Sequence, residues 1–96
     1  MLNAESRIVK AENQVSSDLG GEAVILSLDD GMYYGLDAVG ARVWDLIQQP
    51  RKVAEIQQAI VSEYDVDAAQ CQADLLALFQ DMAGRGLIKV EDDSPA

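Results

Sequence analysis

The hydrophobic pattern of this chain changes its period within one short stretch, residues 21–47, GEAVILSLDDGMYYGLDAVGARVWDLI. Up to Leu36, apolar and polar residues alternate, which is typical of strands that bury one face. After Asp37, apolar residues recur every three to four positions, which is typical of an amphipathic helix. No linker separates the two patterns, so the stretch predicts a sheet whose last strand runs directly into a helix.

Alternation predicts strands over residues 15–19, 24–28 and 32–36. The turns between them contain Gly20-Gly21 and Asp29-Asp30-Gly31, residue types that are common in tight hairpins. Because both connections are short, we expect an antiparallel meander in the order 1-2-3. In its third strand, Met32, Tyr34 and Leu36 share one face, and Tyr33 and Gly35 share the other. We expect Leu36 to face the core.

Helical patterns occupy most of the remaining sequence. The first helix is expected to begin after Asp37, a good N-cap, and to end before Pro50. A second apolar stripe runs from Val53 to Tyr64. Asp67 and Gln70 match a capping box that opens a third helix, which Gly84 and Gly86 end. The apolar stripe of this third helix comprises Cys71, Leu75, Leu78, Phe79 and Met82.

The two ends of the chain are less regular. Residues 1–13 are mostly polar, and their structure stays open, although Ile8 and Val9 allow a short strand. Near the other end, Leu87, Ile88 and Val90 either form a final strand or cover the core. We therefore divide the chain into a polar segment at 1–13, one α+β domain at 14–90 and an acidic tail at 91–96.

Charge narrows the classes of partner. The chain has 17 acidic and 7 basic residues, a net charge of −10 and a pI near 4.1. Such a protein repels nucleic acids and anionic membranes and attracts a basic peptide, unless its carboxylates serve solubility alone. The N-terminus lacks the pattern of a secretory signal, and no apolar run approaches the length of a bilayer span. A single cysteine excludes an internal disulfide and fits a cytoplasmic protein.

The residues offer little for catalysis or metal binding. There is no histidine, which is the commonest proton-transfer group and transition-metal ligand. Cys71 has Gln70, Gln72 and Asp74 nearby, and none of them would activate a thiolate. No calcium-binding or nucleotide-binding loop follows the glycine-containing turns. We expect no catalytic residue, no metal and no cofactor.

An open sheet edge is the remaining candidate site. The strand at 32–36 ends the meander, and an uncovered edge offers its N–H and C=O groups to an extended peptide. If the third helix lies beside this edge, the peptide would enter an apolar groove lined by Tyr34, Cys71, Leu75, Leu78 and Met82. The alternative is that these helix residues are ordinary core positions, which is common for an apolar helical stripe.

Three runs of the sequence carry a family resemblance: VSSDLGGEAVILSLDDGMYYGLDAVGARVWDLI, KVAEIQQAIVSEYDVD and DLLALFQDMAGRGLIKV. Together they resemble the PqqD family of peptide chaperones, which are precursor-recognition elements for ribosomally made, modified peptides (RiPPs). Within that family they are most similar to the stand-alone leader-binding proteins of lasso peptide biosynthesis. The most specific features are the Tyr-Tyr-Gly-Leu-Asp junction at 33–37, Trp44, the link at 64–67 and Gly86-Leu87-Ile88.

The resemblance implies a fold similar to a winged helix-turn-helix, with three strands followed by three helices, and no enzymatic activity. It implies that the leader of a precursor peptide pairs with the third strand and packs on the third helix. The protein would then present the precursor to a leader peptidase, after which the core passes to an asparagine-synthetase-like cyclase. Combined with the groove argument, the predicted peptide-binding residues are Met32, Tyr33, Tyr34, Gly35, Leu36, Cys71, Asp74, Leu75, Leu78 and Met82.

Two capping positions depart from the family pattern, since Asp37 replaces a frequent Asn and Lys52 stands near the usual Thr. These departures concern helix ends and not the groove. The topology also permits a winged-helix DNA-binding regulator, although the third helix has no Lys or Arg before Arg85 to contact phosphates.

Overall fold

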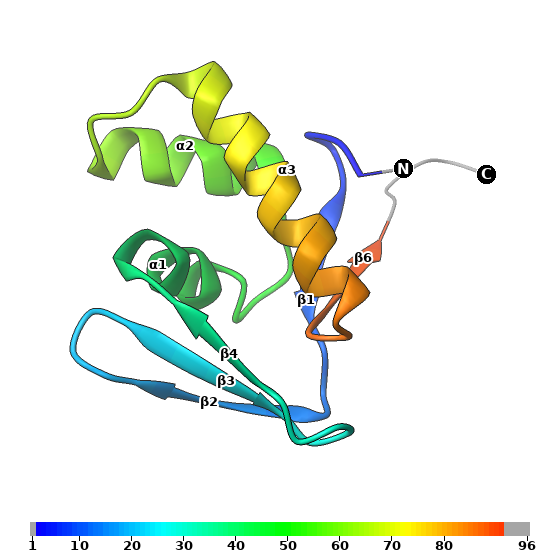
Figure 1. The fold of residues 1–96 in the computed structure, drawn as a ribbon. Helices are drawn as coiled ribbons and strands as arrows, with labels where there is room; N and C mark the ends of the chain where they lie inside the picture. The colour runs from blue at the N-terminus through cyan, green and yellow to red at the C-terminus, as the bar shows by residue number, and fades with distance from the viewer. Residues whose placement is uncertain (1, 92–96) are drawn as a thin grey trace.

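The computed structural model describes residues 2–91 and has the expected α+β fold (Figure 1). Its elements are β1 (Arg7–Lys10), β2 (Gln14–Asp18), β3 (Ala23–Ser27), β4 (Tyr33–Leu36), α1 (Ala38–Leu46), β5 (Arg51–Lys52), α2 (Val53–Glu63), α3 (Ala68–Gly84) and β6 (Ile88–Glu91). The strands form two antiparallel sheets, ordered β2-β3-β4 and β5-β1-β6. Within residues 2–91, no helix has the length and apolar character needed to span a bilayer.

The meander of β2, β3 and β4 is confirmed. In β3, Ile25 is buried and its neighbours Val24 and Leu26 are half-buried, so one face of the sheet covers the core. Leu36 faces the core, as expected. β4 begins at Tyr33, one residue later than predicted, because Met32 still belongs to the turn, where its backbone N–H donates to the Asp30 carboxylate.

A second sheet was not predicted. Its central strand is β1, which pairs with β5 on one side and β6 on the other. Ile8 lies opposite both Arg51 and Val90 and is completely buried. The segment that composition set apart at 1–13 therefore contributes a strand and a core residue. Glu91, which we assigned to the acidic tail, is the last residue of β6, and the rest of that tail lies outside the described residues.

The three predicted helices are present, and their caps explain where they begin. The Asp37 carboxylate accepts a hydrogen bond from the Gly40 N–H at 2.8 Å and starts α1. Asp67 caps α3 in the same way, accepting from the Gln70 N–H at 3.0 Å. At the start of α2, the Lys52 ammonium has no acceptor to offer, and the Glu55 side chain reaches back to the Lys52 N–H instead.

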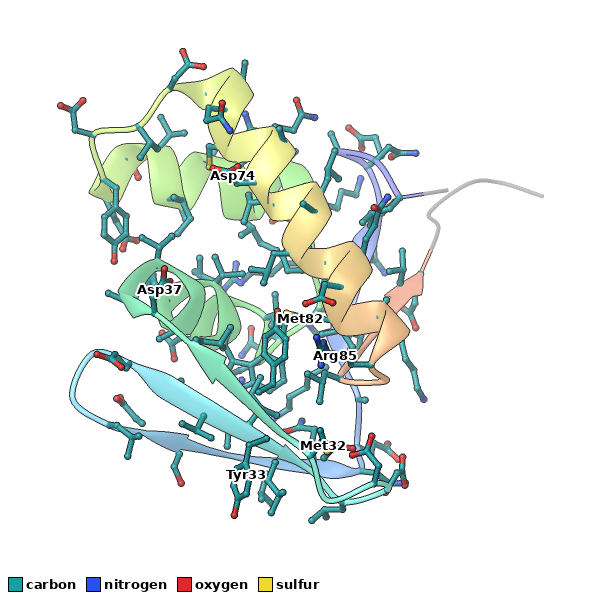
Figure 2. The ribbon with its side chains drawn as sticks, viewed as in Figure 1. Met32, Tyr33, Asp37, Asp74, Met82 and Arg85 are labelled. Carbon is teal, nitrogen blue, oxygen red and sulfur yellow. The ribbon has the colours of Figure 1, made fainter. Side chains whose placement is uncertain are left out.

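One hydrophobic core joins both sheets and all three helices. Its largest completely buried side chains include Phe79 from α3, Ile25 from β3 and Ile56 from α2. Figure 2 shows α3 crossing in front of the core, with the Met82 side chain directed inward. Since α3 packs on the core through only one face, the rest of its surface is available for other contacts.

Candidate functional site

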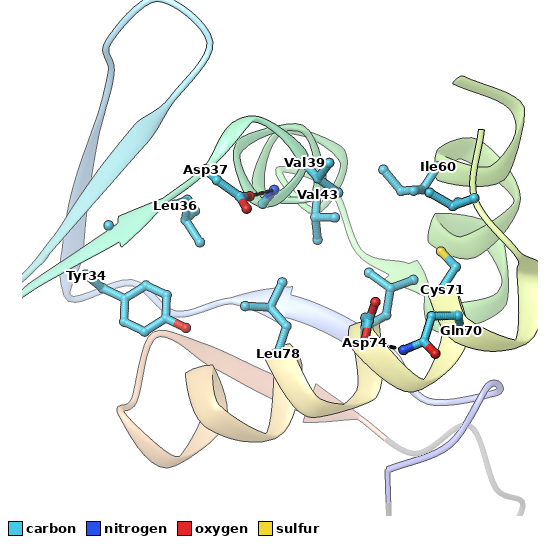
Figure 3. A pocket seen from close by; sticks show the side chains of 14 residues that line it. Tyr34, Leu36, Asp37, Val39, Val43, Ile60, Gln70, Cys71, Asp74 and Leu78 are labelled. Carbon is cyan, nitrogen blue, oxygen red and sulfur yellow. Dashed lines mark hydrogen bonds between the residues drawn. The ribbon is translucent and has the colours of Figure 1, made fainter. Parts of the chain in front are cut away.

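An open groove of about 650 Å³ lies between α3 and the junction of β4 with α1 (Figure 3). Its walls come from elements that are distant in the sequence, because β4 and α1 form one side and α3 forms the other. The lining residues are Tyr34, Gly35, Leu36, Asp37, Val39, Gly40, Val43, Ile60, Val66, Gln70, Cys71, Asp74, Leu75 and Leu78. The volume is typical of a pocket for a small ligand or a few peptide side chains.

The groove runs along a free sheet edge. In the part of the chain that the structure describes, β4 pairs only with β3, so its other edge carries no strand. This is the edge on which the peptide-binding prediction depends. An open edge next to an apolar groove supplies both halves of a strand-addition site, since backbone groups give pairing and the groove accepts alternate side chains.

Local sequence signals position each wall. The Asp37 cap ends β4 and turns the chain into α1, which brings Val39 and Val43 to the groove. The Asp67 cap fixes the start of α3, and helical spacing then brings Cys71, Leu75 and Leu78 to the opposite wall.

The groove is lined mainly by apolar side chains, and its charged side chains are acidic. Among residues 2–91, the ionisable side chains that line it are Tyr34, Asp37, Cys71 and Asp74, and no lysine or arginine of that range lines it. The Asp74 carboxylate accepts a hydrogen bond from the Gln70 amide at 2.9 Å. This lining suits an apolar ligand that carries positive charge or N–H donors.

Tyr34 links the sheet edge to the end of α3. Its hydroxyl donates to Asp81 Oδ2 at 2.8 Å, and the Arg85 guanidinium carbon lies 5.0 Å from the centre of its ring. Arg85 also contacts Asp81, with Nε 3.2 Å from Oδ1. Burial, with the Asp81 hydrogen bond, raises the pKa of the Tyr34 hydroxyl, while that bond is the main cause that lowers the pKa of Asp81. These contacts fasten β4 to α3 at one end of the groove.

Cys71 is a packed side chain in the groove wall. It is 6% exposed, and burial, with a smaller contribution from the charge of Asp74, raises the pKa of its thiol. A raised pKa keeps the thiol protonated and unreactive near neutral pH. Within residues 2–91, no group of three or more cysteine, aspartate or glutamate side chains is placed to hold a metal ion.

The structure brings most of the predicted site residues together. Those that line the groove are Tyr34, Gly35, Leu36, Cys71, Asp74, Leu75 and Leu78. Met82 does not line it, because at 1% exposure it is part of the core, and the expectation that it helps form the groove is corrected. Met32 and Tyr33 also lie outside it and are 60% and 70% exposed. Figure 2 shows Tyr33 pointing away from the helices.

Several lining residues were missed. Val39, Val43 and Ile60 come from the first two helices, where their spacing indicated only that they were apolar helix residues. Val39 and Val66 carried a usable signal in the sequence, since each is an apolar residue within two positions of a predicted cap. The structure leaves these two side chains 37% and 42% exposed. Asp81 and Arg85, which contact Tyr34, carried no signal in the sequence. Tyr34 and Asp81, for example, are 47 positions apart.

Comparisons with known proteins agree with this arrangement. The family model described as "Coenzyme PQQ synthesis protein D (PqqD)" matches residues 22–88. Among solved structures, the chain is similar to one described as "TbiB1 in Complex with the TbiA(beta) Leader Peptide". That chain is 36% identical, the match covers 84% of this chain and 94% of that one, and the TM-score is 0.80. No curated protein matches. With more than half of its length matched by the family model, the chain belongs to the PqqD family of RiPP recognition elements.

Proposed function

We propose that this protein binds the leader segment of a ribosomally made precursor peptide as an additional strand on β4. The observation that carries the proposal is the open edge of β4 beside the groove. The similar solved structure, described as a complex with a leader peptide, supports it. The leader would run antiparallel to β4 and direct alternate side chains between Leu36 and Leu78.

Magnitudes show why the groove is needed. β4 is 4 residues long, so roughly four main-chain hydrogen bonds at about 1 kcal/mol each give about 4 kcal/mol. A micromolar complex requires about 8 kcal/mol after ordering costs of at least about 4 kcal/mol. Side chains buried in the groove must supply the difference. Because Asp37 and Asp74 are the acidic groups there and the protein has a net charge of −10, we expect the leader to be partly basic.

The same proposal includes the role in a pathway. The resemblance to the leader-binding proteins of lasso peptide biosynthesis supports a lasso peptide precursor as the ligand. The protein would act without catalysis in the cytoplasm and would present the precursor to a leader peptidase. The released core would then pass to an asparagine-synthetase-like cyclase.

The test is calorimetric titration with the TbiA(beta) leader peptide, using a groove variant and a matched control. Val39→Glu puts a carboxylate into the groove at an exposed position in the first turn of α1, where an acid does not destabilise the helix. Leu28→Glu makes the same change at a residue that is 58% exposed and does not line the groove. We expect saturable binding by the wild type and Leu28→Glu and at least tenfold weaker binding by Val39→Glu.

Absence of saturable binding by the wild type, or equal binding by both variants, would contradict the proposal. No observation on residues 2–91 favours the alternative of a DNA-binding regulator. Asp74 and Asp81 lie on α3, and Arg85, the basic residue at its end, contacts Asp81. Tight duplex binding in a low-salt gel shift would revive that alternative.

A further inference from the structure

Within the described residues, strands β2, β3 and β4 carry no charged side chain on the face opposite the core, and no helix covers that face (Figure 1). Its rows follow from the strand register: Val15, Leu26 and Tyr33 lie side by side, and so do Ser17, Val24 and Gly35. Val15 and Tyr33, at the two edges of the first row, are 52% and 70% exposed. At the edge of the second row, Gly35 has no side chain, so the row ends early on the strand that we propose to bind the leader.

Gly35 has no conformational reason to be glycine. The glycines with positive φ are Gly20, Gly21, Gly31 and Gly86, and Gly35 is not one of them. A Cβ built on Gly35 meets no heavy atom within 4 Å, so a larger residue fits there. Glycine weakens a strand, and where the backbone does not need it, it often marks a place that a ligand approaches closely.

The missing side chain leaves a notch at the sheet edge. Tyr33, two residues away on the same face of β4, forms one side of the notch, and Val24, directly across from Gly35 and half-buried, forms its floor. Neighbouring strands lie about 4.8 Å apart, and side chains on one face of paired strands touch directly or diagonally. A residue on an added strand opposite Gly35 would therefore meet no side chain on β4 and could lie across it.

We propose that the notch formed by Tyr33, Gly35 and Val24 is a second peptide subsite, which takes a large apolar or aromatic side chain of the leader on the face of the sheet opposite the groove. This inference rests on the proposed strand addition and adds a specificity that the groove does not provide. The row of Val15, Leu26 and Tyr33 and the row of Ser17, Val24 and Gly35 carry no charge, and aromatic side chains are known to cover glycines on edge strands. The protein would thus contact side chains on both faces of the added leader strand.

The test uses Gly35→Val, which fills the notch, and Ser17→Val, which adds the same side chain in the same row on the opposite edge. Each is titrated with the TbiA(beta) leader peptide and with a series of that peptide in which one residue at a time is glycine. We expect Gly35→Val to bind the parent peptide at least fivefold more weakly, and Ser17→Val to bind it as the wild type does. At one outward-facing position of the peptide, replacement by glycine should weaken binding to the wild-type protein by a similar factor. Gly35→Val should bind that glycine peptide as tightly as the wild-type protein binds it.

Thermal unfolding checks that the variant is folded, and we expect Gly35→Val to melt at or above the wild-type temperature because valine favours strands. Gly35→Ala, with a smaller side chain, should show an intermediate loss of affinity. Unchanged affinity of Gly35→Val for the parent peptide overturns the notch and leaves strand addition intact. An equal loss for every peptide overturns it too, because the change would then act on main-chain pairing. If the wild type binds none of the peptides, the proposed function itself fails.

Discussion

Leu78 offers a direct test of which residues of α3 contribute to peptide binding and which contribute to stability alone. It is partly buried and lines the groove, whereas Leu76, two residues earlier on the same helix, is also partly buried but does not line it. Replacing leucine by alanine removes about three carbons, worth about 0.8 kcal/mol each when fully transferred from water, or about 2.4 kcal/mol in total. Because Leu78 is already about two-thirds buried in the free protein, a bound peptide would cover at most about the remaining third. Leu78→Ala should therefore lose about 0.8 kcal/mol of binding, or about fourfold in affinity.

The assay combines calorimetric titration of the TbiA(beta) leader peptide with urea unfolding of the same samples. Leu76→Ala removes the same atoms from the same helix, so the two variants should lose similar stability, of about 1.6 kcal/mol. Only Leu78→Ala should bind the peptide more weakly. The reasoning would be refuted if both variants bound equally well, or if Leu76→Ala lost the greater share of affinity.

Two further predictions concern how α3 is held in place. Asp67→Ala removes the acceptor for the Gln70 N–H and should lower the free energy of unfolding by about 1 kcal/mol in urea, whereas Asp67→Asn should largely preserve it. The pKa of Asp81 is lowered from its ordinary value of 3.8, mainly by the Tyr34 hydroxyl and also by Arg85. The stability that its carboxylate gives is therefore present above about pH 4 and is lost as the pH falls through the lower pKa of the folded state. In melting curves at successive pH values the wild type should lose its advantage over Asp81→Asn in that acidic range, and a constant difference down to pH 2 would contradict the assignment.

Features that depend on near neighbours could be predicted from the sequence. Asp37 and Asp67 cap their helices through backbone groups three residues away, and Gly20-Gly21 forms a turn within its own hairpin. The stripe of α3 likewise depends on a period that the sequence displays directly. In β3 the alternation of Val24 and Leu26 marked the strand, but the residue that the structure buries completely is Ile25, on the other face. The meander, all three helices and the burial of Leu36 were predicted for this reason.

The candidate site was predicted only in part. Tyr34 and the α3 residues Cys71, Leu75 and Leu78 were named correctly as lining residues, because an edge strand and an apolar helix stripe are recognisable separately. The contributions of α1 and α2, and the exclusion of Met82, depend on the angles at which the helices cross. A periodic stripe shows that a helix has an apolar face, but it does not show which of those residues meets an opening and which meets the core.

By itself the sequence determined the two periods, the turns, the caps and an acidic composition without histidine. Tertiary structure alone decided that Arg7–Lys10 would lie between Arg51–Lys52 and Ile88–Glu91, and that Tyr34 would reach Asp81. The physical reason is that strands this short carry almost no periodic signal. Their partners lie tens of residues away, and only packing against the shared core sets the pairing.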